Sequence, residues 1–478
     1  MSAIISRQEF MTATHTAIVS DMHLCEAEPV RPKFPLWKKF KTKEFFFDET
    51  FQRFLFHLEE KAQGNSVELI LNGDIFDFDS VLAIPKEPLF TVSWLETRRG
   101  LSPLPEKAKF KISVILADHP VFVRALADFI KRGNRAVFVI GNHDLELHYP
   151  EVQEEILSAL NLNSEEQQRL RFVEWFYISN QDTLIEHGNQ YDPYCVCEDP
   201  INPFVRGYNY TYLKLPFGNL ACRYILNGMG FFNPHVDSNY IMTLKQYVVF
   251  FLKYVVRAQP GLMITWFWGS VVTLIFSFLD RLAVPIRNAL RIEDRVEKIA
   301  FKANATPRMV RELKELFSDP AASNPFLLAR ELWLDRAFFV MLSFLVIFQV
   351  MVFIKTVFSI SFFWAFIPLF ILLPFFIFYS KSVTSLVSSY KEPDDRVLAM
   401  ASAITGVKRI VFGHTHHSRH EIIGSVEHLN SGCWSPAFLD VECTKPIDQK
   451  TYIWIKPDES GNRSAELLKF VEESQKAT

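Results

Sequence analysis

The chain has 478 residues, which is too long for one small core, so more than one structural region is expected. Its net charge of −3 and its pI near 6.5 are not those of a typical nucleic-acid-binding protein. Hydrophobic residues make up 49% of the chain, but more than half of its 46 phenylalanines lie beyond residue 230. The six cysteines of so long a chain predict reduced thiols rather than a disulfide framework.

Five short apolar segments end in Asp, Asn or His, a pattern that predicts buried strands running into loops. A buried carboxylate is costly unless it pairs with a cation or with hydrogen-bond donors. Oxygen and imidazole ligands gathered from several strand ends are typical of a two-metal site, and we expect Asp74 to lie between the metals. The five segments are AIVSDMH with Asp21 and His23, VELILNGD with Asp74, FVIGNHD with Asn142, His143 and Asp144, LIEHGN with His187, and RIVFGHTHH with His414 and His416.

In chain order, the first predicted strand at 16–20 is followed by a basic segment, Arg31–Lys43. This segment has six basic and no acidic residues, with aromatic residues between them. Two interpretations remain open. The segment is either a solvated basic loop or a surface attracted to anionic lipid or to a phosphorylated substrate.

A helix over 48–63, the strand before Asp74, a helix over 109–132 and a strand over 136–140 follow in a β–α–β rhythm. The long Pro-rich segment 80–107 between them is typical of a lid or substrate loop. An aromatic stretch, Ile201–Tyr240, begins a different composition. The arginines that we predict to bind substrate are Arg98 and Arg99 in the first of these segments and Arg206 in the second.

Three segments over 262–279, 337–354 and 357–379 carry no charge. Each is about as long as the roughly 17–25 residues that cross a bilayer. A buried core helix would explain one such segment, but three together predict a membrane protein.

If His187 and His414 serve one site, the chain between them must cross the membrane an even number of times. The segment 241–256 is the candidate for a fourth crossing, which would give two hairpins, 241–279 and 337–379. The basic loop 281–336 between them then lies in the cytoplasm with the catalytic parts, following the positive-inside tendency. The alternative is a monotopic protein, deeply inserted into one leaflet as a homodimer.

The predicted domain organisation has three parts. Residues 1–237 and 393–478 form the two parts of one catalytic domain, and 238–392 is the membrane insert. A helix is predicted from Thr306-Pro307 to about Phe317, because a threonine N-cap followed by proline is typical of a helix start.

The order D-x-H, GD, GNHD, HG and GHTH, over residues 16–190 and 400–440, resembles the calcineurin-like metallophosphoesterases. The resemblance implies an α/β fold, a four-layer α/β/β/α sandwich, here interrupted by an all-helical membrane insert. It also implies two divalent metal ions, Mn most readily, with Fe, Zn or Mg as alternatives. The implied roles are these: Asp21, His23 and His416 hold one metal; Asn142, His187 and His414 hold the other; Asp74 bridges them; His143 faces the scissile phosphate; and Asp144 orients His143.

The sequence is also distantly similar to the bacterial UDP-diacylglucosamine pyrophosphatases, which share the metal motifs and act on a lipid-bearing pyrophosphate. Those enzymes usually have Arg after the Asn, where this chain has His143. The expected function is hydrolysis of a phosphoester or pyrophosphate bond in a phosphorylated lipid or nucleotide-lipid at the membrane, with no nucleic acid as partner. The alternatives are a tethered phosphatase or phosphodiesterase for a soluble nucleotide-type substrate, and a non-catalytic membrane protein with the same fold.

Overall fold

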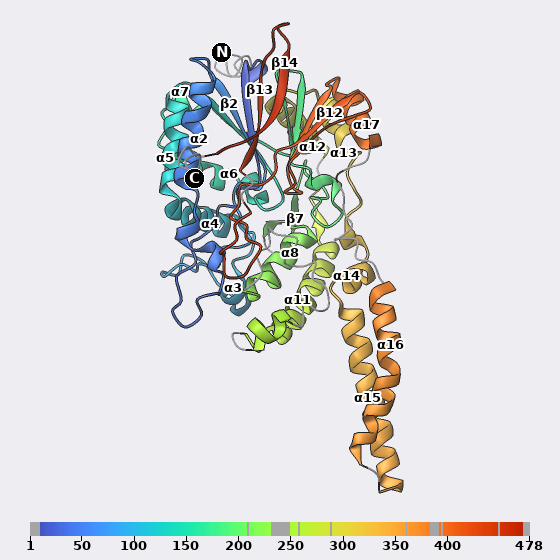
Figure 1. Ribbon diagram of the computed structural model, residues 1–478. Coiled ribbons are helices and arrows are strands. Elements are labelled where there is room, and N and C mark those ends of the chain that lie inside the picture. The colour runs from blue at the N-terminus through green and yellow to red at the C-terminus, as the bar shows by residue number, and fades with distance from the viewer. Residues whose placement is uncertain are drawn as a thin grey trace.

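Two β-sheets packed face to face form the centre of the molecule, and helices cover their outer faces (Figure 1). The computed structural model describes residues 10–207, 210–230, 249–256, 259–286, 289–359, 361–382, 392, 395–447 and 450–471.

The first sheet has six strands in the order β14-β13-β1-β2-β3-β4. The four strands β1 to β4 run parallel, and β13 pairs antiparallel with β1. Parallel strands are covered on both faces, which is why their sequences are nearly continuous apolar runs. The strands of this sheet are β1 (His15–Val19), β2 (Val67–Asn72), β3 (Arg135–Val139), β4 (Leu170–Val173), β13 (Thr451–Pro457) and β14 (Arg463–Lys469).

The second sheet has five strands in the order β11-β12-β10-β6-β5. In its centre β6 and β10 run parallel, with Ile185 opposite Val411, so segments from the two ends of the chain form one sheet. Its strands are β5 (Phe176–Ser179), β6 (Thr183–Glu186), β10 (Arg409–Phe412), β11 (Arg419–Ile423) and β12 (Val426–Asn430). Apolar side chains of both sheets, such as Ile70 and Val411, fill the space between them.

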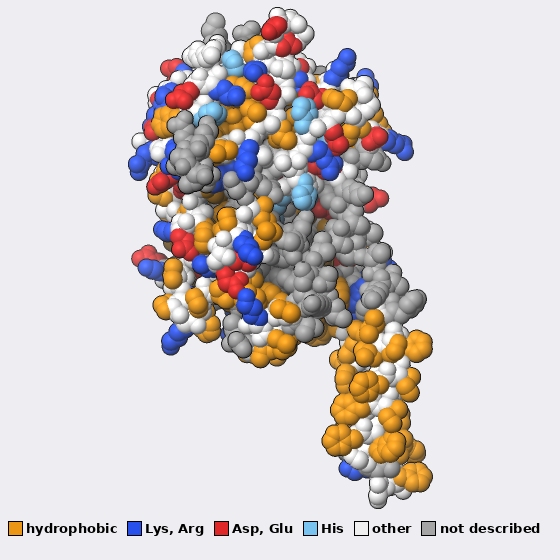
Figure 2. Space-filling view, in the orientation of Figure 1, with side chains coloured by type: hydrophobic (Ala, Val, Ile, Leu, Met, Phe, Trp, Pro, Cys, Tyr) orange, Lys and Arg blue, Asp and Glu red, His pale blue; other side chains and the backbone are white. Residues whose placement is uncertain are grey.

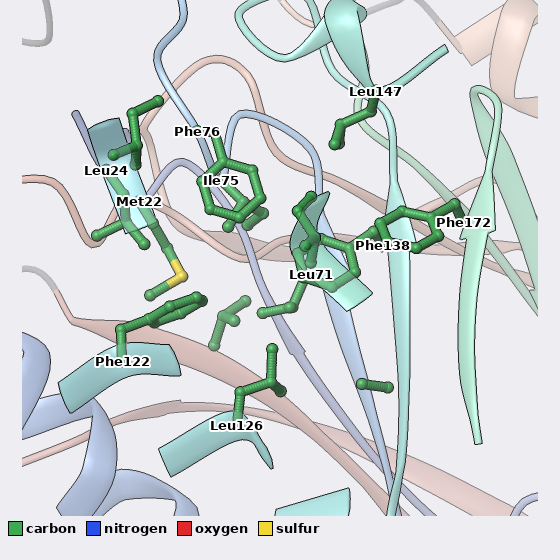
Figure 3. Close-up of a cluster of buried hydrophobic side chains, with 14 of the residues drawn as sticks. Met22, Leu24, Leu71, Ile75, Phe76, Phe122, Leu126, Phe138, Leu147 and Phe172 are labelled. Atoms are coloured by element: carbon green, nitrogen blue, oxygen red, sulfur yellow. The ribbon is translucent and has the colours of Figure 1, made fainter. Parts of the chain in front are cut away.

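A layer of helices covers the first sheet with an aromatic core (Figure 3). Phe138 of β3 stacks between Phe76 and Phe172, with ring centroids 5.9 and 5.2 Å away. The helices of this layer are α2 (Asp48–Lys61), α4 (Pro105–Asp118), α5 (Pro120–Lys131) and α6 (Pro150–Leu160), and shorter helices nearby in the chain are α3 (Trp94–Arg99) and α7 (Ser164–Gln167).

A second helical layer covers the other sheet and consists of α12 (Ala289–Lys302), α13 (Pro307–Lys314) and α17 (Asp395–Thr405). Apolar residues of α12 such as Val296 and Ile299 are buried in this core. Much of the segment predicted as the basic loop of the insert is therefore part of the sandwich. The Thr306 hydroxyl accepts a hydrogen bond from the Met309 N–H, which confirms the predicted helix start. The α/β/β/α layering confirms the predicted fold class.

Two helices are long and apolar enough to cross a membrane, α11 (Leu262–Leu282) and α15 (Leu334–Val357). The shorter apolar helix α16 (Phe366–Ser382) follows α15, and the two form a hairpin that extends away from the sandwich (Figure 1). The hairpin surface is apolar along its length (Figure 2). In contrast, α11 packs against the body, on α8 (Phe217–Tyr224) and α14 (Pro325–Glu331).

Part of the predicted insert differs from the expectation that it is all helical. The two-residue strand β9 (Val284–Pro285) pairs with β7 (Phe204–Arg206), which also pairs with β8 (Thr211–Leu213). Of the predicted crossing 241–256, residues 241–248 lie outside the described residues, and 251–255 form a π-helical turn. The boundaries predicted at 237/238 and 392/393 stay predictions.

The aromatic stack predicts a large effect of removing its central ring. Phe138→Ala should lower the free energy of unfolding by about 3–5 kcal/mol, because it leaves a cavity between two rings that cannot easily collapse. Urea titration in detergent, followed by tryptophan fluorescence, measures the change. Phe34→Ala is the matched control, since that ring is 52% exposed and its loss should cost less than about 0.5 kcal/mol. Equal shifts for the two variants would contradict the stacking argument.

Candidate metal centre

The predicted ligands lie on loops that follow the carboxyl ends of β1, β2, β3, β6 and β10. The loops after β1 and β2 run side by side, with the Asp21 and His23 N–H groups donating to the carbonyl oxygens of Gly73 and Asp74. Left-handed backbone is uncommon for residues other than glycine and costs energy, so its concentration at one site points to function. Five of the predicted ligands have it, with φ of 49–65°: Asp21, His23, Asp74, His414 and His416.

The first group of ligand atoms comes from Asp21, His23 and His416, all within 4.8 Å of one another. The Asp21 Oδ1 atom is buried and accepts no hydrogen bond from the described residues. Nε2 of His416 lies 3.2 Å from this oxygen, and Nε2 of His23 lies 3.9 Å from it. The two Nε2 atoms are 3.3 Å apart. Lone pairs that converge in this way suit a shared cation better than hydrogen bonds between the side chains.

The second group comes from Asp74, His187 and His414, again within 4.8 Å of one another. The His187 Nδ1–H donates to the carbonyl oxygen of Asn72 at 2.8 Å, which directs Nε2 towards Asp74 Oδ2 at 3.1 Å. His187 Nε2 also lies 3.9 Å from Asp21 Oδ1, so the two groups are contiguous. His414 Nε2 is 3.1 Å from Asp192 Oδ2, so its other ring nitrogen is the one that would coordinate.

Asn142 lies beside this second group because the backbone of the preceding Gly141 packs closely against Asp74. A Cβ atom on Gly141 would lie 2.3 Å from Asp74 Oδ1, and one on Gly73 would lie 2.3 Å from His187 Nδ1, so only glycine fits either position. The Asn142 Oδ1 atom is buried and accepts no hydrogen bond from the described residues. A buried amide oxygen in this state is suited to coordinate a cation.

The carboxylates and imidazoles shift one another's pKa in opposite directions. Burial alone would raise the pKa of Asp74, but His187 and then His143 hold it well below its ordinary value. Burial would lower the pKa of His187, but Asp74 and Asp21 raise it to about 9. The buried carboxylates are therefore stabilised by positive charge beside them, which either protonated histidines or bound metal cations can provide. Hard oxygens with imidazoles fit two divalent cations.

Residues 14–217 match the family model described as calcineurin-like phosphoesterase. This part of the chain, less than half of its length, is similar to that family. A search of curated proteins finds no match to the chain. The family depends in general on two metals, which agrees with the two contiguous groups of candidate ligands. The ligand assigned to each metal stays a prediction.

The acids that face His143 differ from the expected one. Both oxygens of Asp144 accept main-chain hydrogen bonds, from Gly141 at 2.6 Å and Ile75 at 2.9 Å. Asp77 Oδ1 and Asp79 Oδ2 each lie 3.4 Å from His143 Nδ1 instead. Asp144 thus shapes the loop that carries Asn142, and Asp77 and Asp79 orient His143. The only sequence signal for this pair is its position two residues apart, just after Asp74.

The predicted substrate arginines lie on two elements and differ in exposure: Arg98 and Arg99 are neighbours at the end of α3, and Arg206 lies on β7. Arg98 is exposed, with its guanidinium 4.9 Å from the centre of the Trp94 ring, and Arg206 is exposed on β7. Arg99 is half-buried, and its carbonyl oxygen accepts a hydrogen bond from Asn227 Nδ2, which also donates to the Asp79 carbonyl oxygen. Of the three, Arg99 is the one linked to the loop that orients His143. The substrate contacts themselves stay predictions.

A buried carboxylate that the sequence does not reveal, Glu392, holds the loop that carries His414 and His416. It accepts hydrogen bonds from Thr415 Oγ1 at 2.9 Å, His428 Nε2 at 2.8 Å and Asn430 Nδ2. The Asn430 amide also donates to the Gly413 carbonyl oxygen. Glu392 lies between α16 and α17 in the chain, in a charged segment that looks like a linker.

This network predicts that Glu392→Ala weakens metal binding. Thr415 stands between two predicted ligands, and losing an outer contact of this kind typically costs about 10–100-fold in metal affinity or activity. Mn²⁺ titration followed by calorimetry measures the affinity. Glu421→Ala is the matched control, because both glutamates contact Arg419, Glu392 at 3.1 Å and Glu421 at 3.2 Å, but Glu421 is exposed. Unchanged Mn²⁺ affinity in Glu392→Ala would contradict the role given to this carboxylate.

Proposed function

We propose that the protein hydrolyses a phosphoester or pyrophosphate bond of a lipid-linked substrate at the membrane surface, with two divalent metal ions. One observation carries this proposal. A single helix, α8, separates the candidate metal centre from the apolar surface of the molecule.

One side of α8 contacts the metal centre. The Asn219 side chain donates through Nδ2 to the Asn142 carbonyl oxygen and to Asp79 Oδ2, both at 2.6 Å. The other side packs on α11, where the Tyr224 ring stacks on Phe276 with centroids 4.9 Å apart. A Cβ on Gly269 of α11 would lie 2.6 Å from the Tyr224 carbonyl oxygen, so the two helices are in backbone contact. A lipid headgroup beside α11 therefore has a short path to the metals.

The outer side of α11 is apolar and exposed, while small residues such as Gly269, Ser270 and Thr273 face the body. Exposed apolar surfaces of this extent mark contact with a membrane or with a partner. The outer residues of α11 are Met263, Ile264, Phe267, Trp268, Ile275, Phe278 and Leu279. This pattern supports an interfacial position for α11, with its apolar side in the bilayer.

The α15–α16 hairpin supports insertion into the membrane. Its first helix has 24 residues. At 1.5 Å per residue that is about 36 Å, more than the roughly 30 Å of a hydrocarbon core. Trp333 and Tyr379 lie at the end near the body, and Trp364 lies at the tip, as in the aromatic belts of membrane proteins. The Tyr379 hydroxyl donates to Asp335 Oδ2, which joins the two ends of the hairpin on one side.

His187 and His414 lie on the same side of the membrane only if the chain between them crosses it an even number of times. In this proposal the α15–α16 hairpin makes two crossings, instead of the four that the sequence predicts. The charged helices α12 and α13 then lie with the catalytic domain on the cytoplasmic side, following the positive-inside tendency. The lipid-linked substrate would enter from the same leaflet, past α11 and α8.

In the proposed reaction two bound metals would supply a hydroxide at neutral pH and polarise the phosphate. The neutral Asn142 keeps the negative charge of the ligand set low, so a phosphate is not repelled. Asp77 and Asp79 hold the His143 ring edge-on against His23, with ring centroids 5.0 Å apart. From there His143 donates a hydrogen bond to the phosphate or a proton to the leaving oxygen.

The test uses purified protein with Mn²⁺ in vesicles made from a total lipid extract of bacterial envelopes. Mass spectrometry follows every phosphorylated lipid, and Asp74→Asn is the control because both metals lose a charged ligand. We expect one lipid class to disappear with the unmodified protein only. If no lipid changes while bis(p-nitrophenyl) phosphate is cleaved, the substrate is soluble and the hairpin is an anchor. If neither is cleaved, the domain is not catalytic.

His143→Ala is expected to lower turnover by roughly 10²–10⁴, the usual contribution of a positioned acid or base. The Mn²⁺ content per protein should stay the same, because His143 lies outside both ligand groups of the proposed assignment. Hydrolysis of bis(p-nitrophenyl) phosphate and elemental analysis of the same sample measure the two quantities. Loss of metal together with activity would place His143 among the ligands instead.

A further inference from the structure

One polar side chain lies exposed in the middle of the apolar hairpin. The uncharged segment 337–354 of α15 contains two polar side chains, those of Ser343 and Gln349. The Gln349 side chain is exposed, whereas Ser343 is half-buried. An amide has two N–H donors and an oxygen acceptor, and each of them needs a hydrogen-bond partner. The surroundings of Gln349 therefore decide what covers this side of the helix.

Gln349 lies within the hydrocarbon core when the hairpin is inserted as proposed above. Helix α15 runs from Leu334 to Val357. At 1.5 Å per residue, Gln349 is roughly 22 Å from the first of these residues and about 12 Å from the last. The hydrocarbon core is roughly 30 Å thick and offers no hydrogen bonds. An amide that faces lipid at this depth loses the hydrogen bonds that water would provide, which costs free energy.

The neighbouring helix of the hairpin does not provide the missing partner. The buried residues of α15 within the uncharged segment are Ile347 and Met351. Each is two residues from Gln349, which is about 200° around a helix of 3.6 residues per turn. The Gln349 side chain thus points away from the buried side. In addition, residues 366–378 of α16 include no polar side chain.

Exposed apolar residues extend the same side of α15 along the helix. Leu342, Leu345, Gln349 and Val352 follow one another at steps of three, four and three residues, and the three apolar side chains among them are exposed. This spacing is that of the seam between helices in a coiled coil, and a single polar residue in such a seam fixes the register and the number of helices. This side of α15 is therefore suited to pack on another helix, with the amide as its polar centre.

We propose that this side of α15 is an interface between two copies of the chain, in which the two Gln349 amides hydrogen-bond to each other. The inference rests on the membrane position of the hairpin in the proposed function and adds a partner to it. An amide is self-complementary, and two-fold symmetry places the same patch on both copies. Two copies inserted in the same orientation also bring their Gln349 side chains to the same depth, which a different membrane protein need not do.

The test measures energy transfer between copies of the full-length protein that carry a donor or an acceptor fluorescent tag. The protein is reconstituted into phosphatidylcholine vesicles, and the protein-to-lipid ratio is lowered stepwise until the transfer falls by half. The variants are Gln349→Leu, which replaces the amide with an apolar side chain, and Gln349→Asn, which keeps an amide. Ser343→Leu is the matched control, because it removes the other polar side chain of the segment, which is half-buried.

We expect Gln349→Leu to need a roughly fivefold or higher protein-to-lipid ratio for the same energy transfer, because it removes the hydrogen bonds between the two membrane helices. Gln349→Asn should stay closer to the unmodified protein than Gln349→Leu does, and Ser343→Leu should match the unmodified protein. Flotation of the protein with the vesicles should be the same for every variant, because no substitution adds a charge to the hairpin.

No energy transfer in the unmodified protein beyond that of random proximity, or equal half-points for Gln349→Leu and the unmodified protein, would overturn the interface. If the protein does not float with the vesicles, the proposed membrane position of the hairpin is wrong, and the interface is overturned with it. A protein that floats and dimerises but hydrolyses nothing would overturn the proposed hydrolysis alone.

Discussion

The structure depends on the balance of charge in one buried space, where two aspartates and four histidines converge from distant parts of the chain. Asp21 Oδ1 faces three imidazoles at 3.2–3.9 Å and accepts no hydrogen bond from the described residues. These side chains alone do not provide a hydrogen-bond donor for every buried acceptor atom, such as Asp21 Oδ1. Left-handed backbone at five of the ligand positions and glycines packed against Asp74 and His187 add to the cost of building the site. The two sheets and their buried strands supply the rigidity that holds this costly arrangement together.

The apolar helices α11, α15 and α16 lie on one side of the sandwich (Figure 1), and α8 lies between α11 and the candidate metal centre. The contacts of α8 explain how they are related, because Asn219 contacts the Asn142 loop while Tyr224 packs on α11. An apolar surface one helix away from the candidate metal centre supports the proposal of a lipid-linked substrate.

The strands and the ligand positions could be predicted because each is local: an apolar run fixes a strand, and the next polar residues fix the loop at its end. Contacts made in three dimensions could not be predicted in this way. Glu392 reads as a linker residue, and Asp77 and Asp79 read as loop acids, until folding places them beside Thr415 and His143. The many basic residues of 281–336 favoured the prediction of a loop there. The apolar side of α12 instead packs in the second core, through residues such as Val296 and Ile299, and Ala303 follows just after the helix.

The sandwich closes between chain segments that are made far apart in time. Ser20 and Ser431 share a hydrogen bond at 2.7 Å across 411 residues, and β1 pairs with β13. At roughly 5–20 residues per second, a ribosome needs about 20–80 s between them. During that interval β1 has an open edge, the aspartates and His187 have no His414 or His416 beside them, and the hairpin has already emerged. The apolar hairpin is thus made before the loop that carries His414 and His416, and the candidate metal centre is completed only after β10.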